Sequence, residues 1–335
     1  MAEPLRIATF GTDLSRDGPG LLLRDILSGH DDQVAAVVAV LAEARADVLL
    51  LTGIDYDHGL AALGALADLL EVKGLDYPHR FALRPNRGMQ TGLDLDGDGR
   101  RGGPDDAQGF GRFAGAGGMA VLSRLPVMAQ EARDFSGFLW RDLPGALLPD
   151  VPAEARAVQR LSTTGHWEVP LRLPGGGSLR LLAWHAAPPV FGLAERNARR
   201  NHDETAFWLR FLSGELPIPP PGAPFVLLGN ANLDPEDGDG MRRAIRALLA
   251  HPTLQDPRPG GAGGMAAPDA DHRGDPALDT AAHRAGNLRV TYVLPSAGLT
   301  IADTGVLWPA PGDPLAETAA TASRHRLVWV DLLPP

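Results

Sequence analysis

The segment that decides the fold is VLLGNANLDP, residues 226–235, in which an apolar run ends in a glycine and two asparagines. The run predicts a buried strand at Phe225–Gly229, because short apolar runs bounded by turn residues are typical of strands with both faces covered. Asn230 and Asn232 follow directly after this strand. Their amide groups can donate and accept hydrogen bonds, which makes them candidate binding residues.

Six further apolar runs have the same character and predict additional buried strands. They lie at Leu5–Phe10, Asp47–Thr52, Gly118–Ser123, Leu179–His185, Leu288–Leu294 and Leu327–Leu332. Between some of them, at 34–41, 60–70 and 241–249, apolar residues recur with the spacing of one helix face. Strands that alternate with amphipathic helices indicate an α/β protein.

The domain count follows from three long loops rich in glycine and proline, at about 85–117, 216–224 and 257–286. None of them is flanked by a complete set of strands and helices that would make a second domain. We therefore expect a single domain over residues 1–335.

A polar run, Asn201-His202-Asp203-Glu204, precedes an aromatic stripe formed by Phe207, Trp208 and Phe211. We expect this run to cap a helix whose aromatic face packs on a sheet, because Asn and Asp side chains accept hydrogen bonds from the first N–H groups of a helix. His202 is expected to be structural rather than catalytic.

The composition argues against several classes of function. A formal net charge of -10, with Lys73 as the single lysine, disfavours nucleic acid as a partner, since binding to phosphate backbones depends on concentrated Lys and Arg. The absence of cysteine excludes disulfides and thiolate metal sites. No run of about 18 apolar residues could cross a bilayer as a helix. Glycine patterns typical of dinucleotide or P-loop sites are also missing.

The GNAN segment resembles the Gly-Asp-x-Asn motif of the endonuclease/exonuclease/phosphatase family, to which pancreatic deoxyribonuclease and apurinic endonucleases belong. Five other segments resemble landmarks of this family in the same order along the chain. These are the strands at Leu5–Phe10, Asp47–Asp57, Leu181–Pro189, Leu288–Ser296 and Ser323–Leu332. The resemblance covers almost the whole chain and implies a four-layer α/β sandwich, in which two packed mixed β-sheets are flanked by helices.

Segments at 94–119, 138–149, 159–167 and 196–208 also resemble a bacterial, commonly exported branch of the family. This likeness implies a periplasmic or secreted protein. The start, Met1-Ala2-Glu3-Pro4, lacks the regions of a signal peptide, and a mature exported chain with a replacement Met would begin in the same way. A cytoplasmic location is the alternative.

In this family a divalent ion, usually Mg²⁺ or Mn²⁺, is held by carboxylates and stabilises the charge that develops on phosphoryl oxygens. The resemblance places the metal-binding Glu of the family at Gly53 and an Asn of the opening strand at Gly11. Neither glycine can bind a metal through a side chain. The Asp of Gly-Asp-x-Asn is replaced by Asn230, a neutral amide that cannot act as a general base.

Two more carboxylates of the reaction centre are replaced. The Asp that orients the closing His corresponds to Thr291, and the Asp beside that His corresponds to Arg324. Only His185, Asn232 and His325 are retained. Because Arg324 adds a permanent positive charge where a carboxylate faces the metal, we do not expect Mg²⁺ or Mn²⁺ at the inherited site.

We therefore interpret the chain as a catalytically impaired relative, a pseudoenzyme, whose cleft binds an anionic small molecule or a protein partner. Arg324 presents a planar fork suited to phosphate or carboxylate oxygens, and further donors come from His185, His325, Asn230 and Asn232. One alternative is a divergent metal-dependent phosphodiesterase or phosphatase with residual activity, and another is a scaffold whose loops carry the function. All eight positions are expected to converge on one cleft at the strand ends.

A separate pattern, DLDGDG at residues 94–99, matches the Asp-x-Asp-x-Asp-Gly start of a calcium-binding loop. Asp105 lies eleven residues after Asp94, where such a loop usually has Glu. Asp94, Asp96, Asp98 and Asp105 are therefore candidates for a structural Ca²⁺ site that orders the loop at 85–117. An acidic, glycine-rich turn without a metal is the alternative, and the flanking helices of an EF-hand are not predicted.

Overall fold

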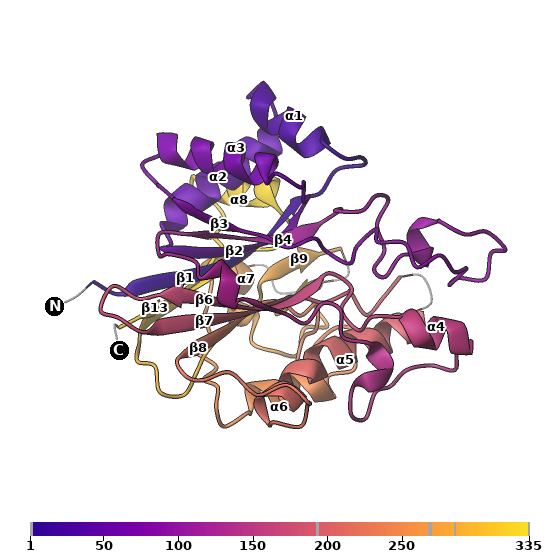
Figure 1. The fold of residues 1–335 in the computed structure, drawn as a ribbon. Coiled ribbons are helices and arrows are strands. Elements are labelled where there is room, and N and C mark those ends of the chain that lie inside the picture. The colour runs from indigo at the N-terminus through magenta and orange to yellow at the C-terminus, as the bar shows by residue number, and fades with distance from the viewer. Residues whose placement is uncertain (1–2, 192–193, 267–269, 285, 334–335) are drawn as a thin grey trace.

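The computed structural model describes residues 3–191, 194–266, 270–284 and 286–333, and their elements form four layers (Figure 1). Two β-sheets pack face to face in the middle, and helices cover the outer face of each sheet. The four-layer α/β sandwich predicted from the sequence is thereby confirmed.

The first sheet has six strands in the order β12-β13-β1-β2-β4-β3. The parallel pair is β1 with β2, and the other neighbours are antiparallel. The strands are β1 (Leu5–Leu14), β2 (Val48–Ile54), β3 (His79–Phe81), β4 (Gly118–Ser123), β12 (Ile301–Leu307) and β13 (Leu327–Leu332). Because β13 pairs with β1, the first and last strands of the chain lie side by side.

The second sheet has five strands in the order β11-β8-β7-β6-β5, with β7 and β8 parallel. The strands are β5 (Arg133–Asp134), β6 (Gly165–Arg172), β7 (Ser178–His185), β8 (Phe225–Asn230) and β11 (Thr291–Pro295). A separate hairpin of β9 (Ala281–His283) and β10 (Gly286–Leu288) lies near the start of β11. Residues 226–235 thus comprise most of β8 and the turn that follows it, and β8 lies between its neighbours β7 and β11.

Helices pack on both outer faces. Those that contribute to the core over the first sheet are α1 (Leu21–Ser28), α2 (Asp32–Ala44), α3 (Ala61–Val72) and α8 (Ala316–Ala322). Those over the second sheet are α5 (Ala194–Leu212) and α6 (Arg243–Leu249). Two short helices, α4 (Ala153–Val158) and α7 (Ala262–Ala266), and 3₁₀ turns at Pro104–Asp106, Ala129–Glu131, Trp140–Asp142 and Pro276–Leu278 lie in the connections.

A shared apolar core joins the two sheets. Ile7, Leu50 and Val330 of the first sheet belong to the same buried cluster as Leu181 and Val226 of the second. All five side chains are fully buried. Since burying one such side chain contributes about 1.5–3 kcal/mol, this interlayer core is a major part of what keeps the sheets together.

Two predicted strands differ from the structure by more than two residues, and hydrogen bonds to side chains explain the second difference. The first strand extends beyond Phe10 to Leu14, through an irregularity in its pairing with β2 between Gly11 and Leu14. The predicted strand at Leu288–Leu294 is divided, because the backbone N–H groups of Arg289 and Val290 donate to the side chains of Asp234 and Thr280 instead of joining a sheet.

The prediction that residues 201–204 cap a helix was wrong. Helix α5 begins at Ala194, and the polar run lies inside it with all four side chains buried. Asp203 accepts a hydrogen bond from the indole of Trp140 (2.6 Å) and contacts the ring of His202 (2.8 Å). His202 is therefore part of the structural core, as expected. A helix interior tolerates these polar groups because they find partners on other elements.

Helix α5 also anchors the loops that surround the second sheet. Glu204 accepts hydrogen bonds from the backbone N–H groups of Thr163 (2.6 Å) and Ala187 (2.8 Å). Arg200 donates to the carbonyl oxygens of Gln108 and Leu161. This buried network fixes the chain just after β7, next to the end of β8.

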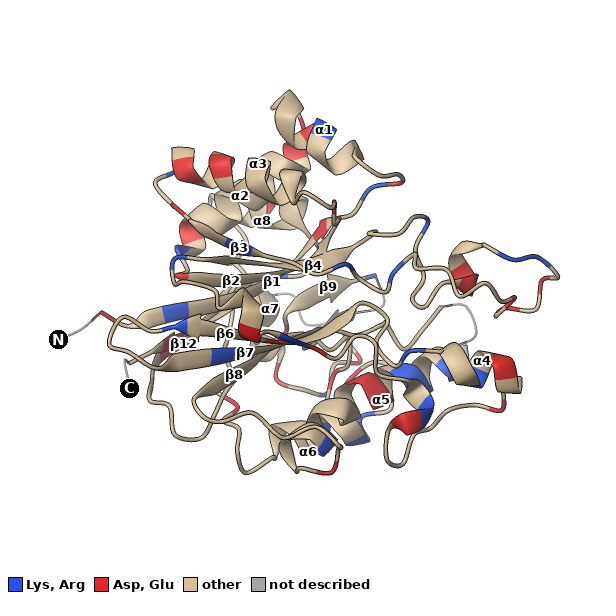
Figure 2. Ribbon diagram, in the orientation of Figure 1, with Lys and Arg blue, Asp and Glu red and all other residues tan. Residues whose placement is uncertain are grey.

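Positive and negative side chains are interspersed over both outer layers, and α5 carries charges of both signs (Figure 2). No helix among the described residues is long and apolar enough to span a membrane.

A substitution in β8 tests how closely the second sheet is packed. Gly229 has a φ of 143°, and a Cβ at this position would lie 1.9 Å from the carbonyl oxygen of Trp184 on β7. We expect Gly229→Ala to lower the free energy of unfolding by on the order of 3 kcal/mol or more, because backbone strain and steric overlap add. Chemical denaturation measures this change.

The matched control is Gly137→Ala, an exposed glycine at which a Cβ would meet no atom within 4 Å. It should change the free energy of unfolding by less than about 0.5 kcal/mol. Equal effects of the two substitutions would contradict this account of β8.

Candidate functional site

The strand ends open onto one cavity of about 1020 Å³. It is bounded by β2 of the first sheet, by β7 and β8 of the second, and by the loop before β13. Six of the eight predicted site residues line it, namely Gly53, His185, Asn230, Asn232, Arg324 and His325. The other two lie directly behind lining residues: Gly11 is packed against His325, and Thr291 pairs with Asn230 across β11 and β8.

The two asparagines shape the turn at the end of β8. Asn230 Oδ1 accepts a hydrogen bond from the backbone N–H of Asn232 (2.8 Å), and Asn232 Nδ2 donates to the carbonyl of Ala186 (2.7 Å). Asn232 has a φ of 47°, a conformation that Asn adopts more readily than most residues. The amides are therefore partly used in fixing the backbone.

The positions without metal-binding side chains are closely fitted to their surroundings. A Cβ on Gly11 would lie 2.9 Å from Cγ of His325, so the imidazole occupies the space that a side chain would need. Gly53 has a φ of 71°, which favours glycine. Thr291 is fully buried behind Asn230.

Three imidazoles meet in the cavity. His185 and His325 are buried, and the ring of His283 lies edge-on to that of His325 with 5.6 Å between centroids. Burial, with the neighbouring Arg87 and His325, lowers the pKa of His185 to about 3. Burial lowers the pKa of His325 to about 4, against the opposing effect of Asp13. Both rings are consequently neutral at pH 7.

Arg324 and Asp13 form the charged pair beside these rings. Arg324 lies on the loop before β13, and its Nε is 3.4 Å from Oδ2 of Asp13. Its side chain is 67% exposed, so the guanidinium is free to reorient toward a ligand. Asp13 follows Gly11 by two residues, within the irregular end of β1.

Arg87 adds a second positive charge to the cavity wall. Its Nε donates to the carbonyl of Phe110 (3.1 Å), so the hydrogen bond joins two parts of the long loop that follows β3. Burial lowers the pKa of Arg87, and the negative charges of Asp55 and Asp13 oppose this effect. A guanidinium remains protonated under such conditions, so Arg87 is a fixed cation.

Asp13, Arg87 and His283 were missed by the sequence analysis. Asp13 had a usable signal, since it follows the opening strand as Asn232 follows β8. Arg87 and His283 lie within the long segments predicted as loops, at 85–117 and 257–286. Nothing in their local sequence indicates that they return to the strand ends.

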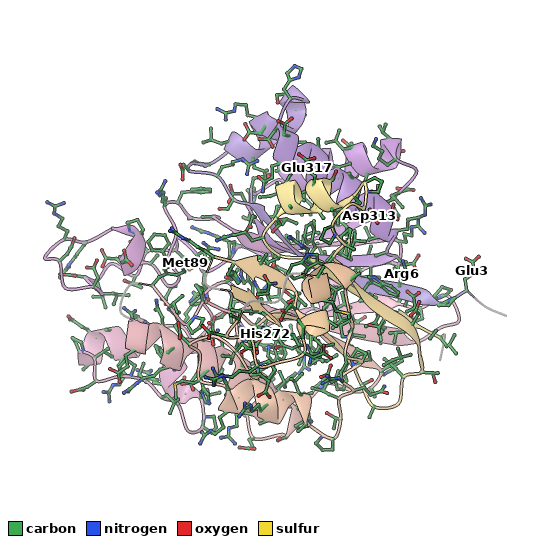
Figure 3. The ribbon with its side chains drawn as sticks, turned by 180° about the vertical axis from the view of Figure 1, so that it is seen from behind. Glu3, Arg6, Met89, His272, Asp313 and Glu317 are labelled. Carbon is green, nitrogen blue, oxygen red and sulfur yellow. The ribbon has the colours of Figure 1, made fainter. Side chains whose placement is uncertain are left out.

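The opposite wall is built by the insertion before β9. Asp237 accepts hydrogen bonds from the backbone N–H groups of Arg273 (3.0 Å) and Gly274 (2.9 Å). The imidazole of His272 lies between two carboxylates, 3.5 Å from Asp237 and 3.7 Å from Asp279. Figure 3 shows His272 inside the molecule, away from the outer helix that carries Glu317.

The sequence profile of the endonuclease/exonuclease/phosphatase family matches residues 26–325. The chain belongs to the endonuclease/exonuclease/phosphatase family. A comparison with curated proteins gave no match.

Solved structures of this family share the fold at low sequence identity. An endonuclease/exonuclease/phosphatase from Beutenbergia cavernae is 19% identical, with a TM-score of 0.57 and coverage of 99% of this chain and 72% of that one. The human Nocturnin catalytic domain with bound sulfate is 12% identical, with a TM-score of 0.52 and coverage of 99% and 95%. A mannosyl-6-phosphatase from Bacteroides thetaiotaomicron is 14% identical, with a TM-score of 0.50 and coverage of 98% and 100%.

The acidic loop that contains residues 94–99 does not line the cavity. Ligand oxygens of Asp94, Asp96 and Asp106 lie within 4.8 Å of one another, whereas Asp98 and Asp105 are not part of this group. Asp106 is buried and accepts hydrogen bonds from the backbone N–H groups of Leu95 and Gly103. Calcium binding by this loop stays a prediction.

The pH dependence of stability follows from the buried imidazoles. Burial lowers the pKa of His166, His185 and His325 to about 4, 3 and 4. A histidine whose folded pKa lies below its unfolded value of about 6.5 stabilises the fold fully above pH 6.5, and this contribution is lost as the pH falls toward the folded pKa. We expect the lost contribution of each imidazole to lower the free energy of unfolding by on the order of 2 kcal/mol between pH 6.5 and pH 4.5.

Urea unfolding at pH 6.5, 5.5 and 4.5 measures the slope of the free energy of unfolding against pH. His185→Asn should make this slope shallower. The exposed His30, changed to Asn, is the control that should leave the slope unchanged. Glu204 acts in the opposite direction, because burial raises its pKa to about 7 and its contribution is lost as the pH rises. Parallel curves for His185→Asn and the unmodified protein would refute the assignment.

The calcium prediction is tested by thermal unfolding. If the loop binds Ca²⁺, millimolar Ca²⁺ should raise the melting temperature, since a ligand of the folded state stabilises it. Asp96→Asn should abolish the rise and Asp105→Asn should preserve it, because Asp96 belongs to the group of three and Asp105 does not. A melting temperature independent of Ca²⁺ would end the prediction.

Proposed function

We propose that this chain is a catalytically impaired member of the endonuclease/exonuclease/phosphatase family that uses the inherited cleft to bind an anionic ligand. The observation that carries the proposal is the pair of arginines, Arg87 and Arg324, which line the cavity together with His185 and His325. A guanidinium presents a planar fork to phosphate or carboxylate oxygens. Arginine would then hold the anion directly, where the family uses a metal ion.

The donor set does not fit Mg²⁺ or Mn²⁺. These ions are usually held by one or two carboxylates, and Gly11, Gly53 and Asn230 supply none. The carboxylate of Asp13, which does line the cavity, is paired with Arg324. The nearby carboxylate of Asp55 is occupied, because it accepts hydrogen bonds from the hydroxyl of Ser15 (2.9 Å) and from the backbone N–H of Gly117 (2.8 Å). We therefore assign no step of a reaction to a metal at this site.

The replacements are also built into the backbone. A side chain at Gly11 would collide with His325, and the left-handed φ of Gly53 would strain a Glu placed there. Restoring the side chains that the family has at Gly11 and Gly53 would thus require the strand ends to move. This interdependence supports a site adapted to another ligand rather than one interrupted by isolated substitutions.

The structural relatives agree with the proposed class of ligand. One is described as a phosphatase that acts on a mannosyl-6-phosphate, and another holds a sulfate ion. A phosphate group and a sulfate ion both carry oxygens to which a guanidinium can donate two parallel hydrogen bonds. We therefore propose a small phosphorylated or similarly anionic molecule, in preference to a protein partner.

The proposal predicts little or no metal-dependent hydrolysis. Phosphodiester and phosphomonoester substrates incubated with Mg²⁺, Mn²⁺ or Ca²⁺ should be turned over no faster than with a heat-denatured sample. Turnover near the typical enzymatic range of about 1–1000 per second would instead favour the divergent phosphoesterase, for which the family membership is the supporting observation.

Substitution of the two arginines tests the binding mode. By calorimetric titration with inorganic phosphate, Arg87→Ala should weaken binding by about tenfold or more, because a partly buried charged donor is lost. Arg324→Ala should weaken it by roughly three- to tenfold, because solvent screens this exposed side chain.

Arg172→Ala provides the matched control, since Arg172 is exposed at the end of β6 and does not line the cavity. Its affinity for phosphate should equal that of the unmodified protein. A uniform loss in all three variants would indicate general electrostatic attraction and not a site.

A further inference from the structure

We propose that Asp13 selects the ligand of this cleft, disfavouring a simple anion and favouring one that carries a positively charged or hydrogen-bond-donating group next to its phosphate or carboxylate. The inference rests on the proposed function, and it names the class of molecule that the cleft accepts. It concerns a residue that no family landmark in the sequence includes.

The backbone holds Asp13 in an unusual conformation. Its φ is 51°, which is uncommon for a residue other than glycine. Gln33 of α2 donates its side-chain amide to the carbonyl of Asp13 (3.1 Å), and Gln33 in turn accepts a hydrogen bond from Arg16 (3.0 Å). This network fixes the main chain of Asp13 from the side of the outer helices.

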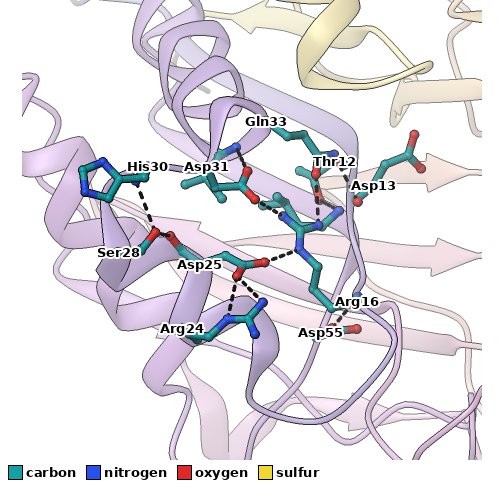
Figure 4. Close-up of polar contacts among 12 residues, drawn as sticks. Thr12, Asp13, Arg16, Arg24, Asp25, Ser28, His30, Asp31, Gln33 and Asp55 are labelled. Atoms are coloured by element: carbon teal, nitrogen blue, oxygen red, sulfur yellow. Dashed lines mark hydrogen bonds and ion pairs between the residues drawn. The ribbon is translucent and has the colours of Figure 1, made fainter.

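The carboxylate of Asp13 is not part of that network. Figure 4 shows it pointing away from the cluster formed by Arg16, Asp25 and Asp31. On its other side, Oδ2 lies 3.1 Å from the hydroxyl of Ser323 and 3.3 Å from the backbone nitrogen of Arg324. The strained backbone thus directs a carboxylate into the cavity.

Positive and potentially positive groups surround this carboxylate. Asp13 interacts electrostatically with Arg87 and Arg324, and with the imidazoles of His185, His283 and His325. Burial by itself would raise the pKa of Asp13, but His325 and Arg324 lower it below its usual value. The carboxylate is therefore ionised at neutral pH, where Arg87 and Arg324 are the cations that face it.

A bound anion would share these cations with Asp13. Two negative charges within about 4 Å repel each other strongly in a partly buried site. The contacts that Asp13 makes with Arg324 are long, at 3.3 and 3.4 Å, so they can yield to a ligand. A simple phosphate must therefore displace the carboxylate or bind beside a like charge.

A ligand with its own cationic group removes this conflict. Its anion can bind Arg87 and Arg324 while its cation or donor group pairs with Asp13. Two other carboxylates of the cavity wall, Asp234 and Asp237, are less suited to this role, because they accept hydrogen bonds from backbone N–H groups of the insertion and the chain around it. The geometry thus favours zwitterionic phosphate esters and related molecules.

The experiment compares two phosphate monoesters that differ by an ammonium group, methyl phosphate and phosphoethanolamine. Calorimetric affinities are measured for the unmodified protein, for Asp13→Asn and for Asp17→Asn. Asp17 is the control. It lies shortly after Asp13 in the chain, and its exposed carboxylate pairs with Arg112 outside the cavity.

The unmodified protein and Asp17→Asn should bind phosphoethanolamine about fivefold or more tightly than methyl phosphate. Asp13→Asn should bind methyl phosphate at least about fivefold more tightly than the unmodified protein does, and should lose the preference. Asn tolerates a positive φ, so this variant keeps the backbone. Asp13→Gly, which suits the same φ, should give the same loss of preference.

The inference is overturned if Asp13→Asn leaves the affinity for methyl phosphate unchanged, or if the preference for phosphoethanolamine survives in both Asp13 variants. The proposed function would stand in either case, because the cleft would still bind an anion. Failure of every variant to bind either ester would overturn the proposed function and the role of Asp13 with it.

Discussion

The face-to-face packing of the two sheets over one apolar core determines where the site residues at the strand ends lie. Parallel pairing of β1 with β2 and of β7 with β8 aligns their carboxyl ends, and the shared core brings the two sets of ends together. His185 and Asn230 are direct partners in the second sheet for this reason. The polar cleft exists because strands that are apolar along their length end in polar residues at the same edge.

This dependence explains how much the sequence could predict. The apolar runs and the residues that flank them identified the strands that end in His185 and Asn230 and the strand that follows His325, so the lining of the cleft by these residues follows from the fold. Arg87 and His283 could not be found in this way, since they lie on long segments whose path is determined by tertiary contacts. Helix α5 shows the same limit, because its buried polar run has the composition of a cap and is stabilised by partners distant in the sequence.

The replacements that we propose for the family's centre are coupled to one another. Without a side chain at Gly11, the imidazole of His325 packs closely against β1. The irregular end of that strand then places Asp13 beside Arg324 and His325. A carboxylate therefore remains near the centre, but it is neutralised by an arginine of the protein itself. Such an arrangement pairs the charges of Asp13 and Arg324 without a bound ion, as the proposed loss of a metal site would require.

The charge balance of the cavity indicates what a ligand must bring. Among the residues that the structure describes, five arginines and five aspartates line it, in a chain whose formal net charge is -10, so this lining is less negative than the protein as a whole. The arginines Arg87 and Arg324 lie near the neutral imidazoles, whereas Asp237 belongs to the opposite wall. Charges of both signs thus face one cavity, and they complement a molecule that itself carries both signs, because each of its charged groups can then meet a counter-charge. A uniformly anionic ligand would be attracted by the arginines but would bring a like charge to Asp13.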